Sequence, residues 1–561
     1  MVIFRLKASI TFLFLFLFLL SLEPEAAQAQ RRRKDSTPPA KPQLIVGIMV
    51  DQMRHDYLYR YWDKYGEDGF KRLLREGFNF KNGHFNYAPT STGPGHASVY
   101  TGTTPAVHGI IGNNWYSRET KEGPYCVADN SVQGVGTASK AGQMSPANLL
   151  STTITDELRL ATNMQAKVVG VALKDRGSVL PAGHTANAAY WYEGASGNWI
   201  TSTYYVQQLP QWVQEFNNRK LPDQYLSQPW ATLLPIEQYT ESSADDVPWE
   251  NTFANEERPV FPHNMPAIRG KGYGALSGTP FGNTFTTEFA IEAIRAEQLG
   301  KRNVTDFLAL SYSSTDLVGH QFGPSSIEVQ DTYLRLDRDL ANLLRFLDGH
   351  VGKENVLIFL TADHGAARSP AYLSSLRIPA GTTSGQVMMD SLDNFLNRRF
   401  GAGKWVERYI NQQVYLDHAL IQRQKVSLTE IQKATAFYLL RQPAVARTIT
   451  EEALMYSDWD SGLMGMIARG YNPRRSGDVM VMLDPEWFHG SGNQGPHRGT
   501  THGSYHTYDT HVPILWYGWK VNPGESVQRA SVTDIAPTIA AWLNIAQPNG
   551  TTGQPLQEYM R

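Results

Sequence analysis

Short, uninterrupted apolar runs that alternate with helix-like segments limit the possible folds most strongly. In "QLIVGIMVDQ", residues Leu44 to Val50 contain no polar side chain. A run of this kind is typical of a strand that is covered on both faces of a parallel sheet. Similar runs lie at 167–176, 306–316, 355–365 and 512–519, with helical patterns at 287–299 and 332–347. The alternation predicts an α/β fold with a mostly parallel central sheet.

The length of 561 residues predicts a large core that carries insertions. Residues 185–280 are rich in Trp, Tyr, Pro, Asn and Gln and have little periodicity, and residues 375–475 hold helical pieces but few strand patterns. We interpret both stretches as insertions on one domain that spans residues 43–561. The pattern of residues 531–545 predicts a short loop followed by an amphipathic helix near the end of the chain.

The N-terminus has the pattern of an export signal. Arg5 and Lys7 precede an apolar run from Ile10 to Leu22, and Ala27-Gln28-Ala29 fits a cleavage site. We expect a signal peptide at residues 1–29, a polar linker at 30–42, and a periplasmic or secreted mature protein. No later run is long and apolar enough for a membrane anchor after cleavage.

Charge and cysteine content exclude several function classes. The formal net charge of −2, from 51 basic and 53 acidic residues, predicts no surface for nucleic acid. Cys126 is the single cysteine, so the chain forms no internal disulfide. We interpret Cys126 as a buried packing residue.

Ionisable residues follow the predicted strands. Asp51 ends the first strand, Asp316 follows the run at 306, and the pair Asp363-His364 follows the run at 355. Lys174 and Arg176 follow the run at 167. One such residue is usually a cap or turn former, but ligands bind at the carboxyl ends of strands in open α/β sheets. Several of these groups at one edge predict a site.

The carboxylates and histidines favour a metal centre. Asp316 and His320 are spaced i and i+4, so a helix would present both on one side. Asp363 and His364 are adjacent, and "GTTHGSYHTYDTHVP" offers His502, His506 and His511. Asp and His are suitable zinc ligands, and the supply is sufficient for two ions, an arrangement known for displacement at phosphorus.

A nucleophile is then required, and "NYAPTSTGPGHASVYTG" offers three hydroxyls. Thr90, Ser91 and Thr92 precede a Gly-Pro-Gly that predicts the start of a helix. Local chemistry leaves open which of them reacts, or whether they only form a turn and a cap. The start of a helix would favour a bound phosphate in either case.

Together these motifs resemble the alkaline phosphatase superfamily. The similarity is greatest to secreted, monomeric bacterial phosphate-irrepressible alkaline phosphatases with a threonine nucleophile. It extends over most of the mature chain, through "GIMVDQMRHDYL", "TGPGHASVYTG", "GIIGNNWY", "LKDRG", "STDLVGH", "TADHG", "GTTHGS" and "TDIAPTIA". The resemblance implies a three-layer α/β/α fold with inserted subdomains, two Zn²⁺ ions and a monomer.

The resemblance also implies individual roles. The nucleophile precedes Gly-Pro-Gly-His, which selects Thr92. One zinc would be held by Asp51, Thr92, Asp363 and His364, and the other by Asp316, His320 and His502. His497, His506 and His511 are close by, and His502 is selected because it lies within "GTTHGS". Asn113 would contact a phosphate oxygen, and Lys174 and Arg176 would form a cationic clamp.

The resulting hypothesis is hydrolysis of small phosphate monoesters through a covalent phosphothreonine. The main alternative is a phosphodiesterase or nucleotide pyrophosphatase of the same superfamily. Lys174 and Arg176 favour monoesters, because a diester lacks the third charged oxygen that such a clamp would bind. A sulfatase is disfavoured because its C/S-x-P-x-R motif is absent, and a phosphomutase is disfavoured by export. A catalytically inactive binding protein would have lost a ligand or the nucleophile.

Overall fold

The computed structural model describes residues 40–254, 256–490 and 498–556. The predicted signal peptide and nearly all of the predicted linker lie outside these residues. Within them, no helix is both long and apolar enough to cross a membrane.

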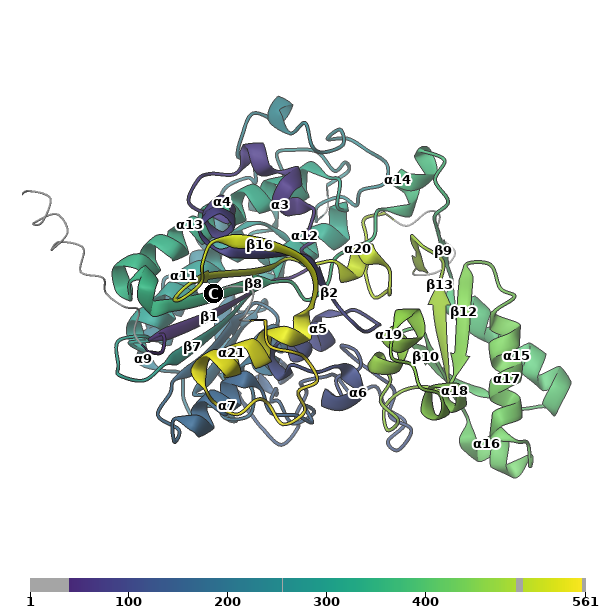
Figure 1. The fold of residues 1–561 in the computed structure, drawn as a ribbon. Helices are drawn as coiled ribbons and strands as arrows, with labels where there is room; N and C mark the ends of the chain where they lie inside the picture. The colour runs from purple at the N-terminus through teal and green to yellow at the C-terminus, as the bar shows by residue number, and fades with distance from the viewer. Residues whose placement is uncertain (1–39, 255, 491–497, 557–561) are drawn as a thin grey trace, which may run out of the picture. The chain divides into compact units, whose positions relative to one another are not determined.

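The core is a three-layer α/β/α arrangement around a ten-stranded sheet (Figure 1). The strand order is β16-β2-β15-β8-β1-β7-β4-β5-β6-β3. Parallel pairs join β8, β1, β7, β4 and β5, so the fold class is confirmed as mostly parallel α/β. The strands are β1 (Leu44–Val50), β2 (Phe78–His84), β3 (Gly134–Val135), β4 (Val168–Ala172), β5 (Ala188–Glu193), β6 (Asn198–Ser202), β7 (Asp306–Tyr312), β8 (Val356–Thr361), β15 (Ile514–Gly518) and β16 (Gly524–Ser531).

The central strands are apolar because helices cover both faces of the sheet. Every residue of β1, β4, β7 and β8 is buried. In Figure 1, α4 and α13 lie above the sheet and α7 and α21 lie below it. The covering helices include α4 (Phe70–Glu76), α5 (Thr92–Thr101), α7 (Ile154–Ala161), α8 (Asp175–Ala182), α11 (Phe281–Ala296), α12 (Ser314–Phe322), α13 (Ile327–His350) and α21 (Ile535–Leu543).

Two predicted features need adjustment. The run at 512–519 forms β15, which is antiparallel to both β8 and β2. Strands β5 and β6 lie inside the stretch that we interpreted as the first insertion, yet they extend the central sheet. Their aromatic side chains are buried here, as where Trp199 stacks on Phe289 at 4.2 Å. The part outside the sheet therefore begins after Ser202, with α9 (Gln211–Asn218) and α10 (Leu221–Tyr225).

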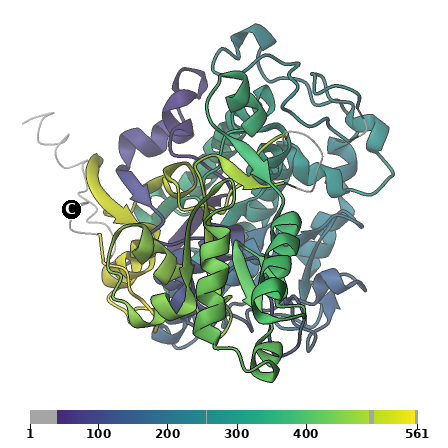
Figure 2. The same cartoon turned by 90° about the vertical axis from the view of Figure 1, so that its right-hand side faces the viewer.

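The second stretch forms a separate antiparallel sheet with its own core. Its strand order is β10-β11-β13-β12, with α15 (Gly385–Phe400) and α17 (Leu428–Leu439) packed on it. Figure 2 shows this green part facing the viewer. The apolar core includes Leu392, Ile431 and Val414. The strands are β10 (Val406–Ile410), β11 (Gln413–Leu416), β12 (Val445–Thr450) and β13 (Val479–Leu483), and a small pair is formed by β9 (Gly381–Thr383) and β14 (Trp487–His489).

Candidate active site

Adjacent parallel strands deliver the acidic residues to one edge of the sheet. Asp51 follows β1, Asp316 lies in the first turn of α12 after β7, and Asp363 follows β8. Because β8, β1 and β7 are neighbours, the three carboxyl groups converge, and all three are at most 3% exposed. Lys174 follows the next strand, β4, and directly precedes α8.

Two groups of side chains place their ligand atoms within 4.8 Å of one another. One consists of Asp316, His320 and His502, and the other of Asp51, Asp316 and His364. Asp363 joins the second group, since its Oδ2 lies 3.5 Å from Nε2 of His364. The rings of His364 and His502 stack at 3.4 Å, so the two groups are continuous.

The histidines present their Nε2 atoms to this centre. Nδ1 of His320 donates to the carbonyl of Thr500 at 2.8 Å, Nδ1 of His364 to Gly365 at 2.9 Å, and Nδ1 of His502 to Thr90 at 2.9 Å. A carbonyl only accepts, so each ring carries a proton on Nδ1 and turns its Nε2 towards the centre. This orientation is common for metal-bound histidines.

The charge of the site also fits a cation. Burial and the charge of Asp51 raise the pKa of Asp363 well above its usual value. Burial also raises the pKa of Asp316, but the charges of His320 and Lys174 outweigh it and hold that pKa well below its usual range. Among the described residues, Oδ1 of Asp51, Oδ2 of Asp363 and Nε2 of His364 have no hydrogen-bond partner. Buried, unpaired oxygen and nitrogen atoms of this kind fit a divalent metal ion.

Lys174 lies between the carboxylates of the two groups. Its Nζ is 2.6 Å from Oδ2 of Asp51 and 2.5 Å from Oδ2 of Asp316. Burial lowers the pKa of this amine, but Asp316 and Asp51 raise it by more than burial lowers it. The net pKa is raised, so the amine stays charged. The predicted clamp lysine is therefore inside the centre, in contact with carboxylates.

Arg176 is held by the loop that contains Cys126. Its Nη1 donates to the hydroxyl of Tyr125 at 3.0 Å, and that hydroxyl donates to Asp175. Oδ1 of Asp175 also accepts from the backbone N–H of Arg176 at 2.6 Å. Two residues thus fix the direction of the guanidinium. Cys126 is fully buried in an apolar cluster, as expected.

The helix predicted at Gly93-Pro94-Gly95 is α5, and Thr92 is its first residue. The Thr92 carbonyl accepts from Nδ1 of His96 at 2.8 Å, and the same nitrogen is 3.5 Å from Oδ2 of Asp363. A side chain at Gly95 would collide with the backbone of Asp363. The start of α5 therefore packs directly against the Asp363-His364 turn.

The two hydroxyl residues that precede α5 have different surroundings. Thr90 donates to the carbonyl of Ser504 at 2.9 Å and is a turn residue. The Ser91 hydroxyl has no partner among the described residues, and Ser91 lines the cleft. Asn113 lies beside this turn, and its Oδ1 accepts the Gly93 N–H at 2.7 Å.

The other candidate histidines lie elsewhere. His511 stacks between His55 at 4.2 Å and His84 at 4.6 Å, and His506 contacts the Leu483 carbonyl. His497 lies outside the described residues. Of His502, His506 and His511, only His502 joins a metal-capable group.

Sequence reasoning missed Gln52. Its Nε2 donates to Oδ1 of Asp316 at 2.6 Å, and its backbone N–H donates to Oδ1 of Asp363 at 3.1 Å. Gln52 therefore connects two acidic residues whose strands are not adjacent. Gln52 directly follows Asp51 at the end of a strand, and this position could have identified it as a site residue.

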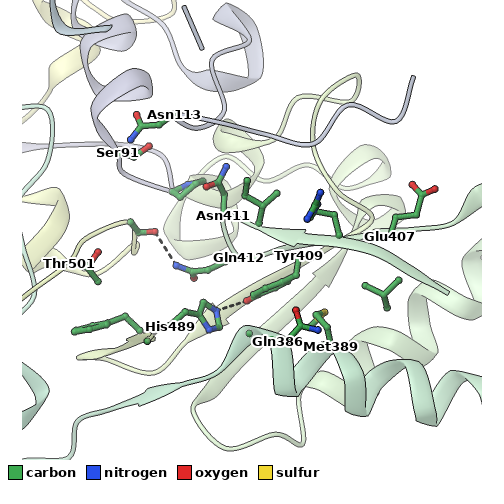
Figure 3. A pocket seen from close by; sticks show the side chains of 18 of the residues that line it. Ser91, Asn113, Gln386, Met389, Glu407, Tyr409, Asn411, Gln412, His489 and Thr501 are labelled. Atoms are coloured by element: carbon green, nitrogen blue, oxygen red, sulfur yellow. Dashed lines mark hydrogen bonds between the residues drawn. The ribbon is translucent and has the colours of Figure 1, made fainter. Parts of the chain in front are cut away.

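A cleft of about 640 Å³ opens beside the centre. Ser91, Asn113 and His502 line it, together with residues from the second sheet. In Figure 3, Asn411 and Gln412 lie between Asn113 and the side chain of Tyr409. The cleft has room for a group larger than a phosphate.

The profile of one protein family, described as type I phosphodiesterase / nucleotide pyrophosphatase, matches residues 45–509. The chain belongs to this family. As a member of it, the chain lies in the alkaline phosphatase superfamily, as its motifs predicted.

Curated relatives of this family member are similar over nearly their full length. An alkaline phosphatase PhoV of Synechococcus elongatus is 47% identical over 93% of this chain and 94% of the relative. An alkaline phosphatase PafA of Elizabethkingia meningoseptica is 45% identical over 92% and 94%. A protein of Myroides odoratus named calcium-transporting ATPase is 48% identical over 92% and 94%.

A solved structure of wild-type alkaline phosphatase PafA superposes with a TM-score of 0.89 at 45% identity, and covers 92% of this chain and 99% of that one. The predicted enzyme class, alkaline phosphatase, is confirmed.

Proposed function

We propose that this enzyme is an exported, zinc-dependent phosphomonoesterase that works through a phosphothreonine at Thr92. The observation that carries the proposal is the convergence of two metal-capable groups with Lys174 and Arg176 beside the start of α5. Two sets of ligands and two cations at one place match the charge of a phosphate monoester.

Asp51, Asp363, His364 and Thr92 would hold one zinc ion, and Asp316, His320 and His502 would hold the other. Bound zinc would lower the pKa of a coordinated hydroxyl and neutralise charge on phosphoryl oxygens. The backbone contacts of the three Nδ1 atoms keep each Nε2 pointed inward for this purpose.

Thr92 supplies the nucleophilic oxygen. Its Oγ1 forms a bond to phosphorus, and the bond from phosphorus to the leaving alcohol breaks. Water then displaces Oγ1 and releases inorganic phosphate. Thr92 is the first residue of α5, so the positive end of the helix dipole favours the phosphate dianion beside it.

Three further residues stabilise the charged oxygens. Asn113 accepts from Gly93 through Oδ1, so its Nδ2 is left to donate to phosphate. Lys174 and Arg176 supply positive charge, and Tyr125 and Asp175 orient Arg176. These cations favour monoesters over the diesters of the alternative function.

The test compares hydrolysis of p-nitrophenyl phosphate with hydrolysis of its bis ester, with and without a chelator. We expect a large preference for the monoester and loss of activity on chelation. A strong diester preference would reject the monoesterase proposal in favour of a phosphodiesterase. Analysis of the N-terminus of the exported protein tests cleavage after residue 29.

A further inference from the structure

The turn between β10 and β11 contacts the two loops that carry Asn113 and His502. Residues Ile410 and Gln413 pair across the hairpin, which leaves Asn411 and Gln412 as a two-residue turn. Both have positive φ, 51° and 59°. This is the backbone of a type I′ turn.

Asn411 holds the loop of Asn113. Its Nδ2 donates to the carbonyl of Asn114 at 2.6 Å. The same amide lies so close to Gly112 that a side chain there would collide with it. Asn411 thus contacts both chain neighbours of Asn113, while Gly93 contacts the Asn113 side chain from α5.

Gln412 holds the loop of His502. Its Nε2 donates to the carbonyl of Gly503 at 3.3 Å (Figure 3). Gln412 is itself anchored, because its carbonyl accepts from the N–H of Val481 in β13. The second sheet therefore braces the loop directly after a proposed metal ligand.

The residue types support a role for the side chains. A type I′ turn accepts glycine best at both positions, because a residue with a Cβ is disfavoured in the left-handed region. Asparagine tolerates the conformation, but glutamine has no such preference. The amide contacts give a reason for Gln412 that the turn itself does not.

We infer that Asn411 and Gln412 are positioning residues for catalysis: Asn411 places Asn113 against the phosphate, and Gln412 places His502. The inference rests on the proposed function for the roles of Asn113 and His502. On this inference, catalysis requires the second insertion, which otherwise only lines the cleft.

Glycine variants provide the sharpest test. Asn411→Gly and Gln412→Gly remove the amides and keep a turn that glycine favours, so the fold is maintained. We expect Asn411→Gly to lower kcat/KM for p-nitrophenyl phosphate about 10-fold with no loss of Tm. Asn163→Gly, at an exposed asparagine that also has positive φ, is the control and should keep kcat/KM within 2-fold of wild type.

A double-mutant cycle separates positioning from a general structural effect. In an Asn113→Ala background, Asn411→Gly should change kcat/KM by less than 2-fold, because its target is gone. A full 10-fold loss in that background, or wild-type activity of Asn411→Gly alone, would overturn the role of Asn411. If wild type prefers diesters, the same cycle on the diester still tests the hairpin, while the monoesterase proposal fails separately.

Gln412 is tested through metal retention. The zinc-loaded Gln412→Gly protein is mixed with a colorimetric chelator, and release of zinc is followed without substrate. We expect zinc to leave several-fold faster than from wild type, with Asn163→Gly unchanged. Equal release from wild type and Gln412→Gly would overturn the role of Gln412.

Discussion

The backbone N–H of Gly93 donates to Oδ1 of Asn113 at 2.7 Å. This contact orients the Asn113 amide. Oδ1 accepts the Gly93 N–H, so Nδ2 is the atom that can donate to a bound phosphate. Asn113→Asp would replace a donor with a charged acceptor next to phosphate. We therefore expect Asn113→Asp to lower kcat/KM for a monoester more than Asn113→Ala does, by at least about 10-fold more. An aspartate variant as active as the alanine variant would contradict this orientation.

Thr92 and Ser91 differ by one position, so they form a matched pair. Thr92→Ala should lower kcat at least about 10³-fold, because no other group replaces the nucleophile. Ser91→Ala should keep kcat within about 3-fold of the wild-type value. Acid quenching with labelled substrate, followed by peptide mass spectrometry, should place the phosphate on Thr92. Label on Ser91, or full turnover by Thr92→Ala, would reject the assignment.

Arg176 should matter most for substrates with three charged oxygens. We expect Arg176→Ala to reduce monoester kcat/KM about 10-fold more than diester kcat/KM. Tyr125→Phe removes the hydroxyl that accepts from Nη1 and should shift the ratio the same way, by less. Equal losses on both substrates would mean that the guanidinium does not contact the third oxygen.

Removal of the metal should affect both activity and stability. A chelator should abolish turnover and lower Tm by several degrees, because ions that bind only the folded chain stabilise it. Added Zn²⁺ should restore both. We expect two zinc ions per chain in wild type and about one in His320→Ala. Activity that survives prolonged chelation and dialysis would exclude the metal mechanism.

Asp339 gives a pH dependence that is independent of the catalytic centre. Burial raises its pKa from an ordinary value near 3.8 to about 8, although Thr284 donates to it at 3.0 Å. The folded chain therefore binds this proton more tightly than the unfolded chain. Its stabilising effect is complete below about pH 4 and is lost as pH rises to about 8.

Asp339→Asn has no titratable group at this position, so it does not lose this stability as pH rises. The Tm of the variant minus that of wild type should increase between pH 5 and pH 9. Thermal unfolding at both values measures the difference, and Asp63→Asn, an exposed aspartate, serves as the control. A constant difference across this range would show that Asp339 does not titrate there.

The sequence predicted the centre of the fold well because buried parallel strands have an unmistakable composition. β1, β4, β7 and β8 were recognisable as apolar runs, and the residues after them were recognisable as site candidates. The direction of a strand could not be predicted from its composition. β15 is buried like its neighbours but antiparallel to them, and burial alone fixes its composition.

Features that depend on contacts between distant segments were not predictable. β10 is only partly buried and shows no clear pattern, so the second sheet was interpreted as helical pieces. Nothing around Asn411 indicates that it reaches Asn114. The choice of His502 over its neighbours came from the family resemblance, since His506 and His511 are equally good ligands by chemistry alone.

The cleft has walls of two origins, and this gives a route to engineering. The groups proposed for bond breaking are fixed by the central sheet, whereas Gln386, Met389, Tyr409 and His489 belong to the second sheet and its neighbours. A library confined to these four positions would vary which alcohol portion is accepted while leaving the reaction intact. Asn411 and Gln412 should be held constant in such a library.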